Sequence, residues 1–323
     1  MIIRYRHATI VLYYFKRIIM MKPYSERTPD LQYKQLLQTI LDKGIRSKSQ
    51  AGTSAENPDG TDCITLFGAN PMRFDLSNGF PMITERSVKG FWKQAVGEII
   101  GFANGARTQT ELEAYGCKFW AAWVTKEKCE KRGLEEGDLG PGSYGAAFHD
   151  FPTAEGESYD QFKYIIEQIK QRPHLKTHFI SPWVPQYTAR VEGRQQKVVV
   201  CPCHGWLHIR ILNGKLNLHM FQRSGDVPIG VPSNMIQYAA LTMMLAQVTG
   251  YEVGEYIHTI SDAHIYVDQI PAVKEFLKRE TFPFPTVTLD NPTTNFTEFR
   301  NTDFTLGDDY HAGEAMKYIP EAI

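Results

Sequence analysis

Residues that could carry chemistry gather between Val198 and Gly250. This stretch holds the thiol of Cys203, the neighbouring imidazole of His204 and the guanidinium of Arg223. Only a thiolate is nucleophilic, and an unperturbed thiol with a pKa of about 8.5 supplies little of it at neutral pH. We therefore expect a cation beside a catalytic cysteine, and Arg223, whose charge is permanent, is the candidate. The alternative is an inert buried thiol, which is the commoner fate of a lone cysteine.

Two β-prone runs must position these groups. They cover residues 198–211 and 215–223 and flank an Asn213-Gly214 pair, which is a strong signal for a tight hairpin. A loop with glycines and prolines follows, and then an apolar segment with helical spacing from about Pro232 to Val248. Polar side chains around these breaks cost free energy to bury unless they are paired. They include Gln222, Ser224, Asp226 and Asn234.

Asn234 is a candidate for recognition of a ligand. A carboxamide presents a donor and an acceptor together, so it can pair with a group that also presents both. Sites built from hydrogen bonds reject the wrong partner strongly, because mispairing leaves buried polar groups without partners. The alternative for Asn234 is a helix N-cap, a role that Ser233 could take instead.

Upstream, residues 89–103 predict a helix in which Glu98 lies within the apolar face. Its carboxylate is either at the edge of that face with its head in solvent, or a buried acid with a raised pKa. Trp120 and Trp123 are one helical turn apart, a spacing that is more typical of a core pair than of a cofactor platform.

The remaining pattern is mixed α and β. Helices are expected over residues 28–43 and 159–171, paired strands around a turn over 62–76, and a strand running into a helix over 255–269. The glycine-rich segment 134–151 fits neither a P-loop nor a dinucleotide fingerprint.

Composition limits the class of protein. The chain has 323 residues, of which 42% are hydrophobic and 22% charged, and its formal net charge is -1. These values are typical of a globular protein without a general attraction to nucleic acid or membrane. Five cysteines form an odd set without a disulfide framework, which favours a reducing cytoplasm. No second cysteine pair stands at zinc spacing, so we expect no metal. The apolar run within residues 1–21 is too short to span a bilayer.

Three linked motifs carry a family resemblance. PCH at 202–204, QRSGD at 222–226 and VPSN at 231–234 resemble the PCH, QRSCD and LPFN motifs of the thymidylate synthase family, in the same order and spacing. Further segments at 64–68, 72–81, 137–145, 262–266 and 311–323 are similar to the same family. The resemblance implies an α+β fold with a large mixed β-sheet packed with helices, one sheet face forming a dimer interface. It implies a single catalytic domain over residues 27–323, after an extension at 1–26 that we expect to be poorly ordered.

In the resembled family, the cysteine thiolate adds to position 6 of the uracil ring of dUMP, so that carbon 5 becomes a nucleophile. The co-substrate 5,10-methylenetetrahydrofolate donates the carbon and a hydride, and the product is dTMP. The resemblance therefore implies a homodimeric cytoplasmic methyltransferase that requires no metal, membrane or nucleic acid. The implied catalytic residues are Cys203, Glu98, Tyr144, Arg223, Asp226 and Asn234. The implied nucleotide-binding residues are Lys176, His204, Gln222, Arg223, Ser224, Asp226, Asn234, His264 and Tyr266. The implied folate-binding residues are Glu98, Trp120, Trp123, Asp226, Gly230, Ala322 and Ile323.

Departures from the family pattern keep two alternatives open. Lys176 and Thr177 stand where the partner subunit would lend two phosphate-binding arginines, which implies weaker monophosphate binding or an altered nucleotide such as a ribonucleotide. Ser233 replaces a phenylalanine, which thins the folate side of the pocket and admits water. Water attack would give a hydroxymethyl product, so one alternative is a pyrimidine nucleotide hydroxymethylase that uses the same folate. The other is a non-catalytic paralogue that binds nucleotide or RNA.

Overall fold

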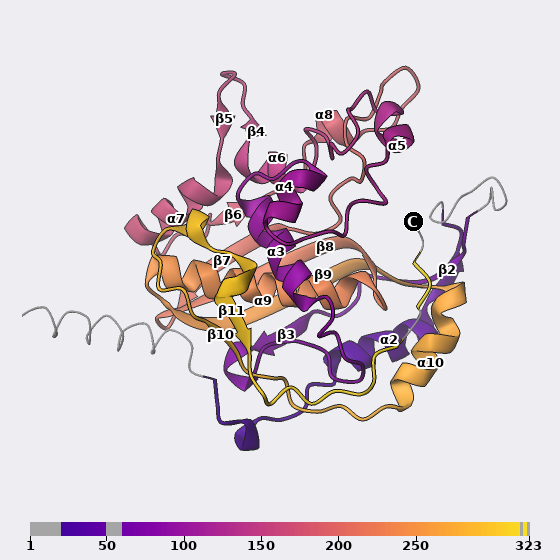
Figure 1. Ribbon diagram of the computed structural model, residues 1–323, viewed down its shortest axis with the longest axis vertical. Helices are drawn as coiled ribbons and strands as arrows, with labels where there is room; N and C mark the ends of the chain where they lie inside the picture. Colours follow the sequence, from indigo (N-terminus) through magenta and orange to yellow (C-terminus); the bar gives the residue numbers. More distant parts are fainter. Residues whose placement is uncertain (1–20, 50–59, 317–318, 322–323) are drawn as a thin grey trace, which may run out of the picture.

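The computed structural model describes residues 21–49, 60–316 and 319–321 of the chain (Figure 1). Residues 1–20, Ala322 and Ile323 lie outside the described residues. From residue 21 onward the chain contacts the body of the protein, because the backbone N–H of Lys22 donates to the carbonyl of Ser77 at 2.8 Å.

A mixed seven-stranded sheet forms the centre of the molecule. Its strands follow the order β1-β2-β9-β8-β7-β6, and β3 also pairs with β9. β8 and β9 are parallel, whereas the neighbouring pairs are antiparallel, which confirms the predicted α+β class with a mixed sheet. The strands are β1 (Ile45–Ser47), β2 (Cys63–Phe67), β3 (Met72–Asp75), β6 (Phe179–Ile180), β7 (Trp206–Leu212), β8 (Lys215–Asp226) and β9 (Glu252–Tyr266).

The predicted hairpin is confirmed as the β7–β8 pair. Asn213 and Gly214 have φ angles of 50° and 75°, and a tight two-residue turn with two positive φ angles matches the twist of its flanking strands. The first predicted strand is too long at its start, because β7 begins only at Trp206. Pro202 has no N–H to give to a ladder, and the carbonyls of residues 201–203 accept from Arg223 instead.

Helix α9 (Gly230–Thr249) joins the parallel strands β8 and β9. It is buried on almost every side, because the sheet covers one face and helix α3 (Trp92–Ala103) packs on another. The helix begins earlier than predicted and β8 continues to Asp226, so the expected loop shrinks to residues 227–229. It ends at Gly250, whose φ of 79° is the left-handed conformation that glycine adopts readily. Asp226 at the end of β8 and Asn234 in the first turns of α9 both lie at the start of this crossover.

The prediction that residues 62–76 form strands paired with one another is wrong. β2 pairs with the end of β9, where Cys63 lies opposite Tyr266, and β3 pairs with its middle, where Met72 lies opposite His258. The 15-residue length of β9 offers room for both short strands on one edge, so the turn between them connects successive partners of a single strand.

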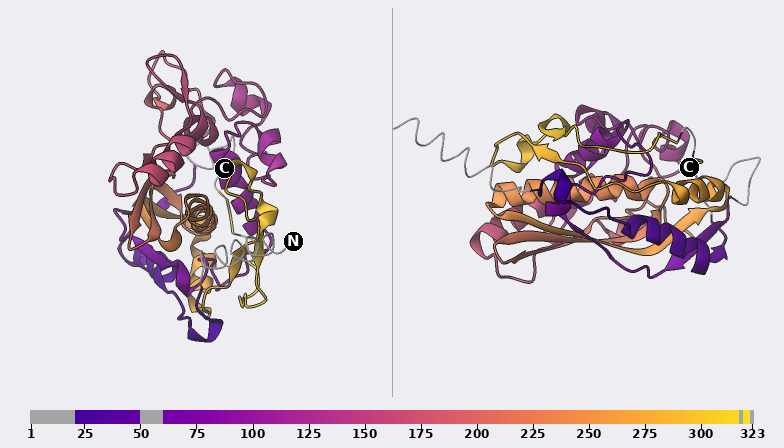
Figure 2. Two further views of the ribbon diagram at one scale, coloured as in Figure 1. Left: turned by 90° about the vertical axis from the view of Figure 1, so that its left-hand side faces the viewer. Right: turned by 90° about the horizontal axis from the view of Figure 1, so that it is seen from below.

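The other elements surround this centre. The remaining helices are α2 (Gln32–Lys43), α4 (Gln109–Ala114), α5 (Lys126–Glu130), α6 (Tyr144–His149), α7 (Gln161–Gln171), α8 (Pro185–Thr188) and α10 (Ile270–Lys278). Two small sheets pair β4 (Phe151–Pro152) with β5 (Ser158–Tyr159), and β10 (Val287–Leu289) with β11 (Phe304–Leu306). Short 3-10 helices cover Tyr24–Glu26, Leu76–Asn78, Val267–Gln269, Phe296–Glu298 and Asn301–Asp303. Figure 2 shows α9 and α3 on the same side of the large sheet.

The opposite side of the sheet carries an exposed row, which we call the open sheet face. Cross-strand register places Phe179 opposite His208, and His208 opposite His219. Phe221 follows on β8, two residues after His219, and Phe179 and Phe221 are 52% and 38% exposed. Successive side chains of a strand alternate between its faces, so Arg223 belongs to the same row.

Candidate active site

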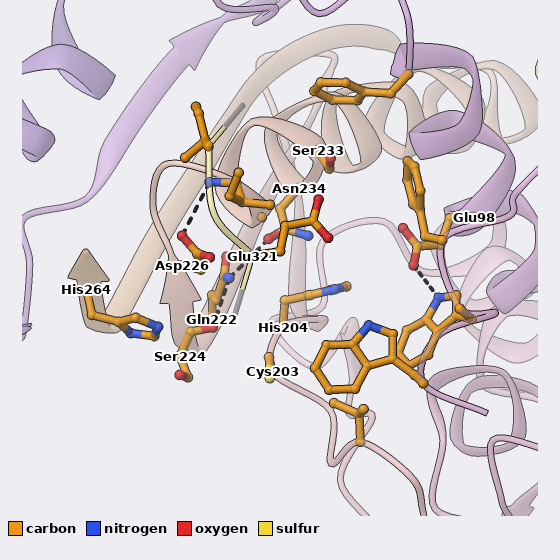
Figure 3. A pocket seen from close by; sticks show the side chains of 18 of the residues that line it. Glu98, Cys203, His204, Gln222, Ser224, Asp226, Ser233, Asn234, His264 and Glu321 are labelled. Atoms are coloured by element: carbon orange, nitrogen blue, oxygen red, sulfur yellow. Dashed lines mark hydrogen bonds between the residues drawn. The ribbon is translucent and has the colours of Figure 1, made fainter. Parts of the chain in front are cut away.

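A cavity of about 840 Å³ collects side chains from α3, β8, α9 and β9 (Figure 3). Its size is within the range of small-molecule sites, about 300–1,000 Å³. In the view of Figure 3, Glu98 and Asp226 lie on opposite sides, with Asn234 between them. The structure therefore brings together most of the residues expected from the sequence. Those lining the cavity are Glu98, Trp120, Trp123, Tyr144, Cys203, His204, Gln222, Ser224, Asp226, Gly230, Asn234, His264 and Tyr266.

Cys203 lies on the segment just before β7, held by contacts to its backbone. Its N–H donates to the hydroxyl of Tyr144 at 2.6 Å, and its carbonyl accepts from the backbone N–H of Arg223 at 2.7 Å. The guanidinium of Arg223 also donates to the carbonyls of Pro202 and Cys201, and its Nη2 lies 3.3 Å from Cys203 Sγ. The thiol thus has a fixed cation beside it.

Two opposing effects act on this thiol. Burial raises the pKa of Cys203, and the nearby Arg223 guanidinium lowers it without cancelling the rise. Burial also raises the pKa of Tyr144 well above its ordinary value, so its hydroxyl stays neutral. The neutral thiol therefore predominates at neutral pH, and the nearby Arg223 guanidinium increases the fraction that is ionised.

Asn234 sits in a set of buried amides. Its Oδ1 accepts from Gln222 Nε2 at 3.0 Å, and its Nδ2 donates to Gln237 Oε1 at 2.9 Å. Gln222 Oε1 in turn pairs with His258 Nε2 at 2.7 Å. Burial lowers the pKa of His258 to about 3, so this imidazole is neutral and donates through Nε2. Each of these side chains is thereby held in one orientation.

Glu98 is a buried acid, the second of the two alternatives that the sequence left open. The residue is 7% exposed, and its two carboxyl oxygens accept from Trp120 Nε1 at 2.6 Å and from Gln237 Nε2. Burial raises the pKa of Glu98 to about 7, although both hydrogen bonds act in the opposite direction. A carboxyl group with this pKa can release and accept a proton near neutral pH.

The two tryptophans lie on a turn rather than on a helix. Helix α4 ends at Ala114, and Gly116 adopts a left-handed φ of 85° that directs the chain away. The N–H of Trp123 donates to the carbonyl of Trp120 at 2.8 Å, closing a turn with the same three-residue spacing as a helix. Both rings line the cavity and provide flat apolar walls.

Asp226, at the end of β8, is the second carboxyl group in the cavity. Its oxygens accept from Gln269 Nε2 at 3.0 and 3.2 Å, and Oδ1 accepts from the N–H of Ile229 at 3.3 Å. Burial raises the pKa of Asp226 to about 6, and the Gln269 contact moderates the rise. Gly230 begins α9 beside it and also lines the cavity.

The ends of β8 and β9 hold the other polar groups together. Ser224 lies opposite Asp262 in the parallel pair, and His264 Nδ1 contacts Asp262 Oδ1 at 3.0 Å. Burial raises the pKa of Tyr266 to about 12, so it is a neutral phenol. His204 stacks on Tyr144 with ring centroids 4.5 Å apart, and burial lowers its pKa to about 3.

The family model for thymidylate synthase matches residues 31–321, nearly the whole chain. The chain belongs to the thymidylate synthase family. Membership supports a nucleotide- and folate-dependent methylation chemistry and an enzyme of the methyltransferase type.

Some residues expected from the family resemblance lie elsewhere. Lys176 is exposed and does not line the cavity; its carbonyl accepts from Nε2 of His208, on the open sheet face, at 3.0 Å. Ala322 and Ile323 lie outside the described residues, but the preceding tail reaches the cavity through Met316, Ile319 and Glu321.

Sequence reasoning missed several residues of this site, among them Arg86 and Gln237. Arg86 is 8% exposed, lines the cavity and donates to the carbonyl of Pro228 at 2.8 Å. Gln237 joins Asn234 to Glu98. A signal for Gln237 existed, because it follows Asn234 by three residues and so shares its helix face.

Within residues 21–49, 60–316 and 319–321, no helix is both long enough and apolar enough to cross a bilayer. No group of three or more His, Cys, Asp or Glu side chains gathers there as a metal site.

Proposed function

We propose that the protein is a thymidylate synthase, converting dUMP to dTMP with 5,10-methylenetetrahydrofolate through a covalent adduct on Cys203. The observation that carries this proposal is the sharing of one cavity by a thiol with a fixed cation, a carboxamide and a buried acid. These are Cys203, Asn234 and Glu98. Cytoplasmic location, suggested by the unpaired cysteines, is part of the same proposal.

Cys203 acts as the nucleophile. Its thiolate bonds to carbon 6 of the uracil ring, and the electron pair of the 5,6-double bond moves toward carbon 5 and the adjacent carbonyl. Arg223 favours the thiolate because it stands 3.3 Å from the sulfur. Glu98, with a pKa of about 7, accepts or supplies protons on the other side of the cavity.

The carboxamide of Asn234 reads the base. With one N–H and one oxygen lone pair committed to Gln237 and Gln222, a second N–H and a second lone pair remain. They match a carbonyl and the ring N–H of uracil. Ser224, His264 and Tyr266 lie at the strand ends where the sugar and phosphate would extend.

The remaining space suits the folate. Trp120 and Trp123 offer flat walls for a pterin ring, and Asp226 offers carboxylate acceptors for its N–H groups. When bound, methylenetetrahydrofolate supplies the one-carbon unit and the hydride. Gly230 and the described part of the tail, Met316, Ile319 and Glu321, complete this side.

We infer a homodimer through the open sheet face. Phe179 and Phe221 expose apolar rings on a strand surface, which is an unusual arrangement for a monomer. Arg223 and the backbone of Lys176 lie on or beside that face. A partner seated there would bring its own Lys176 toward the nucleotide phosphate, as a point charge in place of arginine.

A hydroxymethylase is the second candidate, because Ser233 lines the cavity beside Asn234. A hydroxyl there can hold a water molecule where the family pattern has a phenyl ring. Water attack on the exocyclic methylene intermediate would leave a hydroxymethyl group on carbon 5.

Product analysis tests the proposal. The full-length protein is incubated with dUMP and methylenetetrahydrofolate, and both products are identified by mass. We expect dTMP together with dihydrofolate. Hydroxymethyl-dUMP with tetrahydrofolate would establish the hydroxymethylase, and bound nucleotide without turnover would establish a non-catalytic paralogue. Parallel incubations with UMP and dCMP define the sugar and the base.

A further inference from the structure

A continuous row of side-chain hydrogen bonds joins the base-reading position to the buried acid. Gln222 donates to Asn234 at 3.0 Å, Asn234 donates to Gln237 at 2.9 Å, and Gln237 donates to Glu98. Gln237 is the member without a role in the mechanism above. It is 1% exposed, and both ends of its amide are engaged within this row.

Both ends of the row have only one chemical role each. At one end, Gln222 Nε2 also donates to the carbonyl oxygen of Ser224 at 2.9 Å, and a carbonyl can only accept. At the other end, Glu98 is a carboxylate above its pKa of about 7 and can then only accept, and one of its oxygens accepts from the indole N–H of Trp120 at 2.6 Å. Above that pH, the direction of every hydrogen bond between these ends follows from chemistry.

This direction decides how Asn234 must point. Its oxygen faces the N–H of Gln222, and its amino group faces the oxygen of Gln237. A reversed Asn234 would set donor against donor at Gln222 and acceptor against acceptor at Gln237. Gln237 could not turn over to relieve the second conflict, because its own oxygen would then face the charged carboxylate of Glu98.

We propose that Gln237 is a positioning residue that sets selectivity for uracil over cytosine, by holding the carboxamide of Asn234 in a single orientation against the Glu98 carboxylate. Uracil offers a ring N–H and a carbonyl at neighbouring positions, whereas cytosine offers a ring acceptor and an amino donor. Cytosine therefore needs the reversed carboxamide, which the row excludes. The inference rests on the proposed function, since it requires a pyrimidine nucleotide at Asn234.

Two substitutions at position 237 separate the two contacts. Gln237→Met keeps the length of the side chain but removes the acceptor for Asn234 and the donor to Glu98. Gln237→Glu keeps an acceptor for Asn234 but places a second carboxyl beside Glu98, and two carboxyls sharing one site retain a proton to higher pH. Gln247→Met is the matched control, because Gln247 is a buried glutamine of the same helix whose amide donates to the carbonyls of Asn291 and Thr293.

Glu98 is the group whose titration these variants address, and its other titratable neighbours stay neutral. Cys117, Tyr144 and Tyr238 lie close to it on three different segments, and burial raises the pKa of each. Asp226, the other carboxyl group in the cavity, has a pKa of about 6 and forms its hydrogen bonds with Gln269 and Ile229, so a change near pH 7 that follows substitution of Gln237 reports on Glu98.

The experiment measures dissociation constants for dUMP and dCMP at pH 8 by calorimetry, and the pH profile of kcat/KM with dUMP. Circular dichroism and melting curves show that each variant is folded. We expect Gln237→Met to lower the preference for dUMP over dCMP at least about tenfold, the factor carried by one hydrogen bond of ordinary strength. We expect Gln237→Glu to keep the preference and to move the Glu98 midpoint to higher pH. Gln247→Met should change neither.

Three results would overturn the inference. They are an unchanged preference in folded Gln237→Met, a loss of preference in Gln237→Glu equal to that in Gln237→Met, and an equal loss in Gln247→Met. Failure of the proposed function looks different, because the unmodified protein itself would then yield no dTMP from dUMP.

Discussion

Arg223 Nη2 lies 3.3 Å from Cys203 Sγ, and the same guanidinium is held by the carbonyls of Pro202 and Cys201. The cation is thus fixed before any substrate arrives. Fixed charges are effective in catalysis because they need no reorganisation during the reaction. Because burial opposes ionisation of the thiol, its reactivity depends on the neighbours that lower its pKa, first Arg223 and then the hydroxyl of Tyr144.

Replacing Arg223 by glutamine should therefore make Cys203 much less reactive. An opposite charge at this distance typically lowers a pKa by about 1–3, so we expect alkylation by iodoacetamide at pH 7.5 to slow at least about tenfold. The measurement is made in a Cys201→Ser background, because Cys201 is also partly exposed. Arg223→Lys keeps the charge and should lose less. Equal rates in Arg223→Gln and the parent would show that the guanidinium does not control the thiol.

The raised pKa of Glu98 predicts how stability depends on pH. Between about 4.5 and 7 the folded protein retains a proton that the unfolded chain has released, so the free energy of unfolding falls as pH rises through this window. The full difference amounts to about 3 kcal/mol. Urea unfolding of wild type and Glu98→Gln at several pH values isolates this contribution. Parallel stability curves for the two proteins would refute it.

Substitutions of Trp120 and Trp123 can be compared to test what sets the pKa of Glu98. Trp120 donates to Glu98 at 2.6 Å and so lowers the carboxyl pKa, whereas Trp123 packs against Lys128, whose Nζ lies 5.0 Å from its ring centre. Trp120→Phe should move the Glu98 midpoint of the pH–rate profile up by about one pH unit, the value of one hydrogen bond to a charged group. Trp123→Phe should leave the midpoint in place. A similar displacement in both variants would contradict this assignment.

The open sheet face predicts the oligomeric state. Phe221→Glu places a charge in the row that we expect to be buried between subunits, so the dimer should dissociate and activity should fall with it. Tyr164→Glu is the matched control, since Tyr164 on α7 is 44% exposed and Phe221 is 38% exposed. Light scattering coupled to size-exclusion chromatography measures both masses. A wild-type protein that elutes as a monomer, or a dimeric Phe221→Glu variant, would dismiss this interface.

Features of the fold that depend on neighbouring residues in the chain could be predicted from the sequence. The Asn213-Gly214 turn fixes the hairpin, and the hairpin brings Arg223 back to Cys203 because the two strands run side by side. Gln237 and Glu98 are 139 residues apart in the sequence, and their contact depends on the packing of α9 on α3. The periodicity of apolar residues within each helix does not predict this packing. The tryptophan spacing was misleading for a related reason, because a single turn produces the same spacing as a helix.

The same limit applies to the strands. β2 and β3 carry clear strand patterns, but both pair with β9, which lies far along the chain from them, and β2 also pairs with β1 on its other edge. The alternation of apolar and polar residues shows that a segment forms a strand. It does not show which other strand that segment pairs with. The family resemblance supplied most of the site, whereas Arg86 and the contact of Gln237 with Glu98 became visible only in the three-dimensional structure.

The central claim is that Cys203 bonds to the pyrimidine, and one measurement tests it most directly. Wild type and Cys203→Ser are incubated with 5-fluoro-dUMP and methylenetetrahydrofolate, and intact protein masses are recorded. In dUMP, the hydrogen on carbon 5 must leave as a proton before the product can form. In 5-fluoro-dUMP a fluorine atom takes its place and cannot leave as a cation, so the adduct should persist. We predict a mass increase equal to nucleotide plus folate in wild type, located on Cys203 by fragmentation, and none in Cys203→Ser. An unmodified wild type that binds both molecules, or an adduct in Cys203→Ser, would contradict the account.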